Sequence, residues 1–162
     1  MSFPRRAAIL VQAFTVKTQR SESVYLETMP MKPMEMPSLK EGLKACRLVQ
    51  GEADGLPGLT VDRYNNILVT QVESYGTEMH KDVIYAALVS ELEKMGESID
   101  GIYERNEGEL RKKEGLLQYK GWYGKKHPAT TITQIVENGI IYEVDVENGQ
   151  KTGFFLDQKY NR

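Results

Sequence analysis

At residues 51–62 the chain reads GEADGLPGLTVD, and this stretch decides how the rest of the sequence is interpreted. Three glycines and one proline fall within its first eight residues. Glycine adopts backbone angles that other residues avoid, and proline fixes φ and removes a donor. From Leu59 onward apolar and polar residues alternate, which indicates a strand. The stretch therefore predicts a tightly shaped loop that leads into a strand, and a purely structural turn is its simplest interpretation.

Two phosphate-binding motifs are excluded for this loop. No Gly-Lys-Ser/Thr follows the glycines, as a P-loop requires. A strand is expected after the loop, whereas a dinucleotide-binding fingerprint leads into a helix. Glu52 and Asp54 are acidic, so we expect them to shape the loop by accepting backbone N–H groups and not to contact phosphates.

Composition excludes several classes of protein. The chain has 162 residues, of which 40% are apolar and 27% charged, which is typical of one globular domain with or without appendages. No apolar run approaches the roughly 18 residues that a transmembrane helix needs, so no membrane partner is expected. The single cysteine, Cys46, excludes an internal disulfide and favours the reducing cytoplasm. The net charge of −2 means that any nucleic-acid surface must be local.

The first 44 residues predict no complete domain. Residues 7–16 fit either a strand or a short helix. Residues 29–37 place three prolines among four methionines, and proline breaks both helices and strand ladders. We therefore expect residues 28–38 to form an extended linker or a strap on the core, with the methionines packed against a neighbour and not around a metal.

From Ala45 the sequence predicts an α+β fold in which one long helix packs on a mostly antiparallel sheet. The expected strands are 46–49, 59–63, 67–73, 99–104, 131–136 and 140–146. The long helix is expected to begin at a Thr77 cap and to run to about Met95, with Gly96 as its stop. Its expected buried stripe consists of Met79, Val83, Ile84, Ala87, Leu88, Leu92 and Met95. His80 lies beside this stripe and is expected to be a surface residue.

Two hairpin turns have clear sequence signals. Asn65-Asn66 suits a tight turn because asparagine tolerates positive φ. Asn138-Gly139 is the signal of a type I′ turn. The second hairpin should place Ile140, Tyr142, Val144 and Val146 on one face.

A basic segment lies between the long helix and the second hairpin. Asn106 and Glu109 have the spacing of a capping box, which predicts a short helix at 107–114 that stops at Gly115. Residues 116–130 are expected to form a loop. Residues 105–127 contain seven Lys or Arg against three Glu, with aromatic residues between them. Such residues neutralise phosphates and stack on unpaired bases, although a solvated helix beside a loop has the same composition. The candidate RNA-binding residues are Arg111, Lys112, Lys113, Lys120, Trp122, Lys125 and Lys126.

Three motifs together resemble a known family. Residues 51–63, the run RKKEG at 111–115 and the run KTGFFLDQ at 151–158 closely resemble bacterial S-adenosylmethionine-dependent 23S ribosomal RNA methyltransferases that make 5-methylcytosine. The resemblance covers about residues 45–162. It implies that residues 45–147 form the family's central EEHEE-like domain. Residues 148–162 would then begin a truncated Rossmann-like methyltransferase domain, while residues 1–44 match no complete PUA domain.

The resemblance also implies roles. In the complete protein Phe154, Phe155, Asp157 and Gln158 would face the S-adenosylmethionine cofactor, or their segment would only join two domains. The cofactor loop and the nucleophilic cysteine would lie beyond Arg162, so this chain alone is expected neither to bind the cofactor nor to catalyse. Cys46 precedes the glycine loop and is not that cysteine. Ribosomal RNA is the implied partner, and the oligomeric state stays open, a homodimer included. The alternative is a free-standing RNA-binding or scaffold module without catalysis.

Overall fold

The computed structural model describes residues 44–158. The expected linker or strap at residues 28–38 lies outside the described residues, as do residues 159–162.

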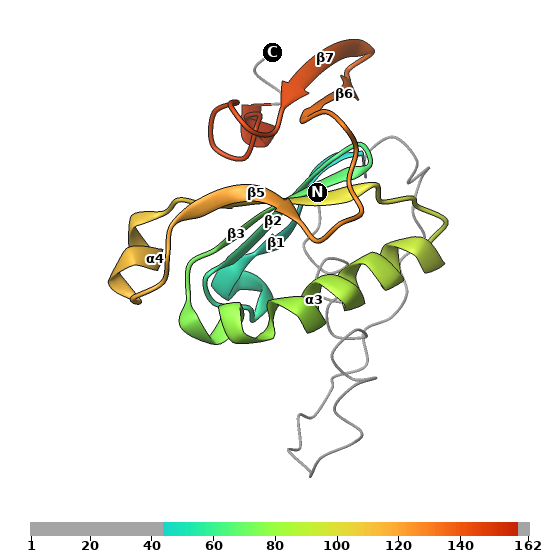
Figure 1. The fold of residues 1–162 in the computed structure, drawn as a ribbon. Coiled ribbons are helices and arrows are strands. Elements are labelled where there is room, and N and C mark those ends of the chain that lie inside the picture. Colours follow the sequence, from blue (N-terminus) through green and yellow to red (C-terminus); the bar gives the residue numbers. More distant parts are fainter. Residues whose placement is uncertain (1–43, 159–162) are drawn as a thin grey trace.

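The described chain forms a five-stranded sheet, one long helix and a separate two-stranded hairpin (Figure 1). The sheet has the order β1 (Ala45–Gln50), β2 (Leu59–Tyr64), β3 (Ile67–Val72), β4 (Gly101–Asn106), β5 (Tyr119–Tyr123). Its neighbouring strands are antiparallel except β3 and β4, which run parallel because α3 (Tyr75–Lys94) crosses between them. The hairpin consists of β6 (Ile132–Glu137) and β7 (Ile140–Asp145). The remaining helical pieces are α4 (Glu109–Lys113) and the 3-10 turns η1 (Gly51–Asp54) and η2 (Leu156–Gln158). This architecture confirms the predicted α+β class.

The two faces of the sheet are covered by different elements. Figure 1 shows α3 below the sheet and the β6–β7 hairpin above it. Successive residues of β2 point to opposite sides of the sheet. Leu59 and Val61 belong to the core between the sheet and α3, and Tyr64 belongs to the core between the sheet and the hairpin. Among residues 44–158, twelve buried apolar residues lie on the α3 side of the sheet and seven on the hairpin side, so the larger share of their hydrophobic stabilisation is on the α3 side.

The glycine loop is the structural turn that its sequence predicts. Asp54 Oδ2 accepts a hydrogen bond from the backbone N–H of Gln50 at 2.6 Å, whereas Glu52 is exposed. Gly58 has φ of +71°, and a Cβ there would lie 2.8 Å from the backbone nitrogen of Ser74. The loop is therefore packed tightly against the start of α3. The carbonyl of Pro57 accepts hydrogen bonds from the hydroxyls of Ser74 and Thr77, which fixes that contact.

Helix α3 begins earlier than predicted, and its predicted stripe is only partly buried: Ile84, Leu88 and Leu92 are buried as predicted. Ser74 is its N-cap, and the backbone N–H of Thr77 donates to the Ser74 hydroxyl at 3.3 Å. Met79 is 64% exposed, and Val83 and Met95 are also exposed. The predicted stripe omits Tyr85, which is buried. Its hydroxyl forms hydrogen bonds with Thr70 and Glu104, which offset the cost of burying that polar group. The predicted stop is confirmed by Gly96, whose φ is +81°.

Two predictions for the segment after α3 were wrong. Asn106 does not cap a helix but lies in β4, where its amide oxygen accepts from the backbone N–H of Val72 at 2.8 Å. Helix α4 therefore starts only at Glu109, and its first position is preceded by Gly108. The expected loop at 116–130 contains strand β5, which pairs with β4 through contacts such as Tyr103 opposite Trp122.

Both predicted hairpin turns are confirmed. Asn65 has φ of +54°, and Asn138 and Gly139 have φ of +53° and +78°. Positive φ at both central residues is what a type I′ turn requires. In the second hairpin Val144 and Val146 are buried as predicted, while Ile140 at the tip is exposed.

Candidate functional site

A buried polar junction ties the C-terminal motif to the sheet. Its centre is the carboxylate of Asp62 on β2, which is 1% exposed. Arg47 on β1 donates to both oxygens of this carboxylate, from Nε at 2.7 Å and from Nη2 at 2.9 Å. The hydroxyl of Thr152 donates to Oδ2 of Asp62 at 2.6 Å. Residues from two motifs that are 90 positions apart therefore meet in one hydrogen-bonded group.

Tyr64 completes this junction. Its hydroxyl lies 2.8 Å from Oγ1 of Thr152 and 3.0 Å from the carbonyl oxygen of Phe154. The backbone N–H of Phe154 donates to the same hydroxyl at 3.3 Å. Burial and the neighbouring charge of Asp62 raise the pKa of Tyr64 to about 12, so the phenol keeps its proton at neutral pH. We call Arg47, Asp62, Tyr64, Thr152 and Phe154 the Asp62 junction.

The four predicted cofactor residues follow directly after this junction. Phe154 is half-buried and packs on the hairpin-side core, with its ring 5.3 Å from that of Tyr142. Phe155 is half-buried and has the Lys151 ammonium 5.1 Å from its ring centroid. Asp157 is exposed and Gln158 is half-buried. Phe154 is thus directed into the protein, whereas Asp157 presents its carboxylate to solvent.

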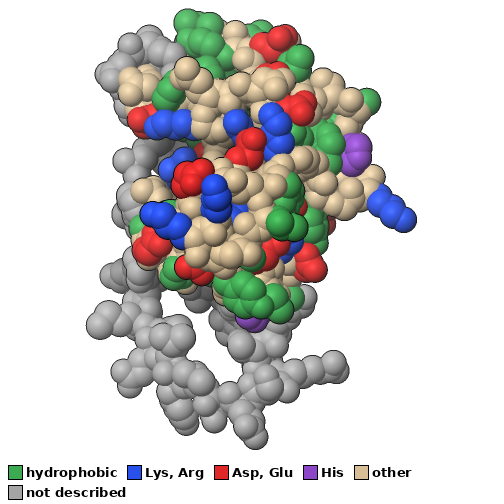
Figure 2. All heavy atoms as spheres, turned by 60° about the vertical axis from the view of Figure 1, so that its left-hand side comes forward, with side chains coloured by type: hydrophobic (Ala, Val, Ile, Leu, Met, Phe, Trp, Pro, Cys, Tyr) green, Lys and Arg blue, Asp and Glu red, His purple; other side chains and the backbone are tan. Residues whose placement is uncertain are grey.

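The predicted RNA-binding residues divide into two groups. The exposed lysines are Lys112, Lys113, Lys120, Lys125 and Lys126. They lie on α4, on β5 and in the loop that follows β5. On the face shown in Figure 2, Lys and Arg side chains are interleaved with Asp and Glu side chains. That face therefore carries no unbroken basic patch.

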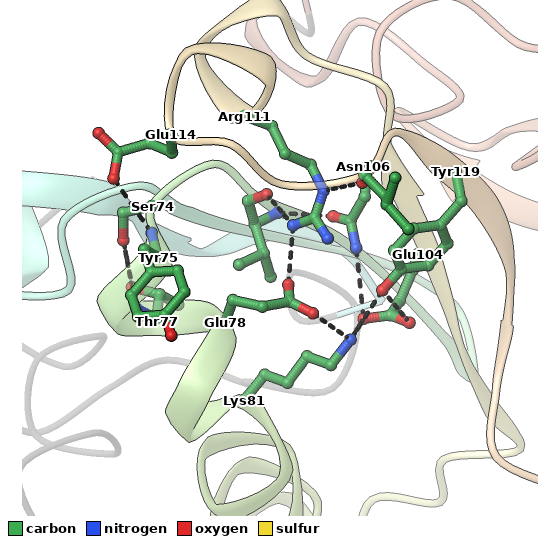
Figure 3. A network of polar contacts seen from close by, with 12 residues as sticks. Ser74, Tyr75, Thr77, Glu78, Lys81, Glu104, Asn106, Arg111, Glu114 and Tyr119 are labelled. Carbon is green, nitrogen blue, oxygen red and sulfur yellow. Dashed lines mark hydrogen bonds and ion pairs between the residues drawn. The ribbon is translucent and has the colours of Figure 1, made fainter.

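Arg111 does not belong to this surface, which corrects the prediction for it. Its side chain is 2% exposed and points from α4 toward α3 (Figure 3). Nη1 donates to Oε2 of Glu78 at 2.7 Å and to the carbonyl of Val72 at 2.8 Å, and Nε donates to the carbonyl of Leu117 at 2.6 Å. The guanidinium also lies 5.1 Å from the ring centroid of Tyr119. A buried guanidinium with these partners supports the fold and cannot contact a phosphate.

Arg111 is one member of a larger buried network (Figure 3). Lys81 on α3 lies 2.9 Å from Glu78 and 3.1 Å from Glu104 on β4, and it donates to the Tyr119 hydroxyl at 2.7 Å. Burial lowers the pKa of Lys81, but these hydrogen bonds and the charge of Glu104 outweigh burial and raise the pKa above its usual value. Because the opposite charges face one another, this network joins α3, β4, α4 and β5 in one arrangement.

Trp122 is also placed differently from the prediction. It lies on β5 and is half-buried. The ring of His127 stacks on it at 5.2 Å between centroids with an interplanar angle of 5°, and Tyr103 packs edge-on at 5.1 Å. Trp122 therefore does not lie in an open aromatic loop, and His127 covers one face of its indole.

The described part of the chain contains neither a candidate metal site nor a helix that could span a membrane. Between residues 44 and 158 no group of three or more His, Cys, Asp or Glu could hold a metal ion. None of the helices described there is long and apolar enough to cross a membrane. Cys46 is half-buried on β1 and packs against the α3-side core.

Comparison of the sequence with known proteins found relatives of this chain. No protein-family model matches the sequence. The chain is 45% identical over 123 residues to the ribosomal RNA large subunit methyltransferase I of Shewanella frigidimarina. That match covers 76% of this chain and 30% of that protein. The protein of the same name from Aliivibrio fischeri is 44% identical over 124 residues, with the same coverage of both chains. The chain thus spans about a third of the length of the curated relatives that it matches.

Solved structures resemble the fold. A putative S-adenosylmethionine-dependent methyltransferase from Streptococcus mutans has a TM-score of 0.58 and 21% identity, and the match covers 99% of this chain and 35% of that one. A putative methyltransferase complexed with SAH matches with the same values. At this identity the likeness shows the fold alone.

Proposed function

We propose that this chain is the front and central portion of an S-adenosylmethionine-dependent ribosomal RNA methyltransferase. In this role it contributes RNA recognition and support for a catalytic domain in the cytoplasm. The observation that carries the proposal is the 45% identity over 76% of the chain to a ribosomal RNA large subunit methyltransferase I. The likeness in fold to solved methyltransferases agrees with it. The relatives' greater length leaves room for the domain that would do the chemistry.

The finer proposal is carbon 5 of cytosine in 23S rRNA, and it rests on the three motifs. Carbon 5 is a poor nucleophile until a thiolate adds to carbon 6, after which the ring carries the character of an enamine. S-adenosylmethionine supplies the methyl group when it is bound. Cys46 is not a candidate for the thiolate, because it is half-buried in a strand of the sheet. This chain would therefore bind and orient without carrying out the reaction.

The residues after the Asp62 junction fit a cofactor contact by their chemistry. The aromatic ring of Phe155 can pack on a nucleobase, the Asp157 carboxylate can accept hydrogen bonds from ribose hydroxyls, and Gln158 can donate or accept. Phe154 would support them from the core. Because a separate domain would have to close over them, we expect no measurable binding of S-adenosylmethionine to this chain alone. Titration calorimetry checks this, and micromolar binding would contradict it.

For RNA, we propose that the exposed lysines of α4, β5 and the following loop contact phosphates. Lysine ammonium groups neutralise phosphates and release counterions, so each contact adds about one unit to the slope of log affinity against log salt. Only five lysines are available in this set, and the exposed Glu109 and Glu114 flank Lys112 and Lys113 in the sequence, which predicts weak binding with little sequence preference.

The test is a salt titration of binding to a fluorescently labelled transcript of structured bacterial 23S rRNA. Replacing Lys112 and Lys113 together by alanine should lower the slope by up to about two units. The matched control replaces Lys44, which directly precedes β1, and Lys94, in the last turn of α3; both are exposed and lie outside the predicted RNA-binding set. Equal slopes for the wild type and the Lys112/Lys113 variant would show that α4 faces away from RNA.

A free-standing RNA-binding or scaffold module is the second candidate. One observation favours it, namely that the described residues form their own cores on both faces of the sheet. The reading frame beyond Arg162 separates the two candidates. A strand, a glycine-rich turn and a helix would favour the methyltransferase, and a stop codon would favour the module.

A further inference from the structure

We propose that Asp62 and Thr152 form a positioning clamp that holds the segment Lys151–Gln158 against the sheet. The purpose of the clamp, which is to fix the side chains that would face the cofactor, rests on the proposed function. The clamp itself follows from the geometry of described residues. Asp62 and Thr152 are positioning residues and touch no reacting atom.

The first step is the charge of Asp62. A carboxylate that is almost fully buried is costly unless hydrogen bonds and an opposite charge compensate for it. Arg47 supplies the charge and two donors, and Thr152 supplies a third donor at 2.6 Å. The Thr152 hydroxyl is itself buried, at 1% exposure. If the segment moved away, Asp62 would lose a donor inside the protein, and this cost disfavours the movement.

The second step is the weakness of the segment's own structure. Backbone hydrogen bonds at its two ends are short-range: the Gly153 N–H donates to the Gln150 carbonyl at 2.9 Å, and the Gln158 N–H donates to the Phe155 carbonyl at 3.3 Å. The first belongs to an isolated bridge between Gln150 and Gly153, and the second closes the three-residue 3-10 helix η2. Local structure of this size is marginal in water, so contacts with the sheet have to fix the segment.

The third step is the close packing on the approach to Thr152. A side chain at Gly149 would collide with the carbonyl oxygens of Gly153 and Asp145. Nη1 of Arg105 on β4 donates to the Gly149 carbonyl at 2.6 Å. The chain therefore enters the clamp in one defined position.

The fourth step is what the clamp orients. With Thr152 fixed, Tyr64 holds both backbone polar groups of Phe154, whose ring packs on Tyr142. The segment then returns to β1, which η2 contacts. Both ends of the segment therefore lie against the β1–β2 part of the sheet.

Hydrogen exchange followed by mass spectrometry on the 162-residue chain tests the clamp. Thr152→Val keeps the branched shape and removes the hydroxyl, and peptides from 149–158 should then exchange at least about tenfold faster while those from β2–β4 are unchanged. Thr152→Ser restores the donor and should return exchange to within about threefold of the wild type. The control is Thr60→Val, on the same strand and face as Asp62, which should leave the segment unaffected.

A second variant covers the case in which Thr152→Val fails to fold. Tyr64→Phe keeps the ring in the core and removes one hydroxyl, so it should give the same local acceleration with smaller amplitude. Wild-type exchange at 149–158 in both variants would overturn the proposal, as would a failure of Thr152→Ser to restore protection. The assay contains neither RNA nor cofactor. A wild-type chain that does not bind rRNA would therefore refute the proposed function and leave the clamp standing.

Discussion

Each face of the sheet carries a group of hydrogen-bonded polar residues, but the two groups hold different parts of the chain in place. On the α3 face, the network of Glu78, Lys81, Glu104 and Arg111 connects elements that a large apolar core already holds together. On the hairpin face, the Asp62 junction holds a short segment above a smaller core. Removing one partner of a buried ion pair leaves an uncompensated charge, so each group favours the arrangement in which its partners meet. The α3-face network connects α3, β4, α4 and β5, whereas the hairpin-face junction places the C-terminal motif.

The largest effect should come from breaking the α3-face network. Arg111→Ala removes one of the two cations beside Glu78, together with the donor to two carbonyls, so we expect a loss of about 3–5 kcal/mol in the free energy of unfolding. Urea denaturation measures it. The neighbouring Lys112→Ala is the control, and it should stay within about 0.5 kcal/mol because Lys112 is exposed. Equal midpoints for the two variants would mean that Arg111 is not a structural residue.

A smaller loss is expected on the hairpin face. Gly139→Val places a β-branched residue at φ of +78° and should cost about 1–3 kcal/mol. Hydrogen exchange should show the loss in β6 and β7 and not in α3. Gly76→Ala is the control of opposite sign, because no atom lies within 4 Å of a Cβ at that helical position. Destabilisation spread evenly over both faces would contradict the separation of the two cores.

Acid should weaken the α3 face through Glu78. Burial raises the pKa of Glu78, but hydrogen bonds from Arg111 and Lys81 outweigh burial and hold it below the usual value. A depressed folded-state pKa contributes stability above the unfolded value of about 4.3 and loses it as pH falls through the folded value. The stability difference between wild type and Glu78→Gln should be on the order of 1 kcal/mol at pH 7, constant down to about pH 5, and should shrink below that. A difference that grows on acidification would contradict this sign.

The smallest effect concerns the corrected face of α3. Met79→Ala should change stability by less than about 0.5 kcal/mol because the side chain is mostly exposed. Leu88→Ala, on the buried face of the same helix, should cost about 2–5 kcal/mol. Thermal or urea unfolding compares the two directly. Similar losses in both would restore the stripe that the sequence predicts.

Part of the candidate site was predictable and part was not. The lysines of α4 are exposed, as a basic run predicts, and the role of the motif at 151–158 stays a prediction. The roles within these runs were not readable. Arg111 stands beside Lys112 and Lys113 in the sequence but points the other way, and only its partners on α3 and β3 explain why. Asp62 and Thr152 both lie inside recognised motifs, yet nothing in one sequence pairs positions that far apart.

Features that depend on near neighbours in the chain could be predicted from the amino-acid sequence. The turn at Asn138-Gly139, the stop at Gly96 and the strand after the glycine loop follow from backbone sterics and from side-chain alternation over a few residues. The tertiary structure was needed to show that Tyr85 and not Met79 or Val83 is buried on α3, that β5 is a strand, and that Asp62 contacts Thr152. Those outcomes depend on where hydrogen-bond partners and apolar surface arrive from distant parts of the chain, and a local pattern carries no record of them.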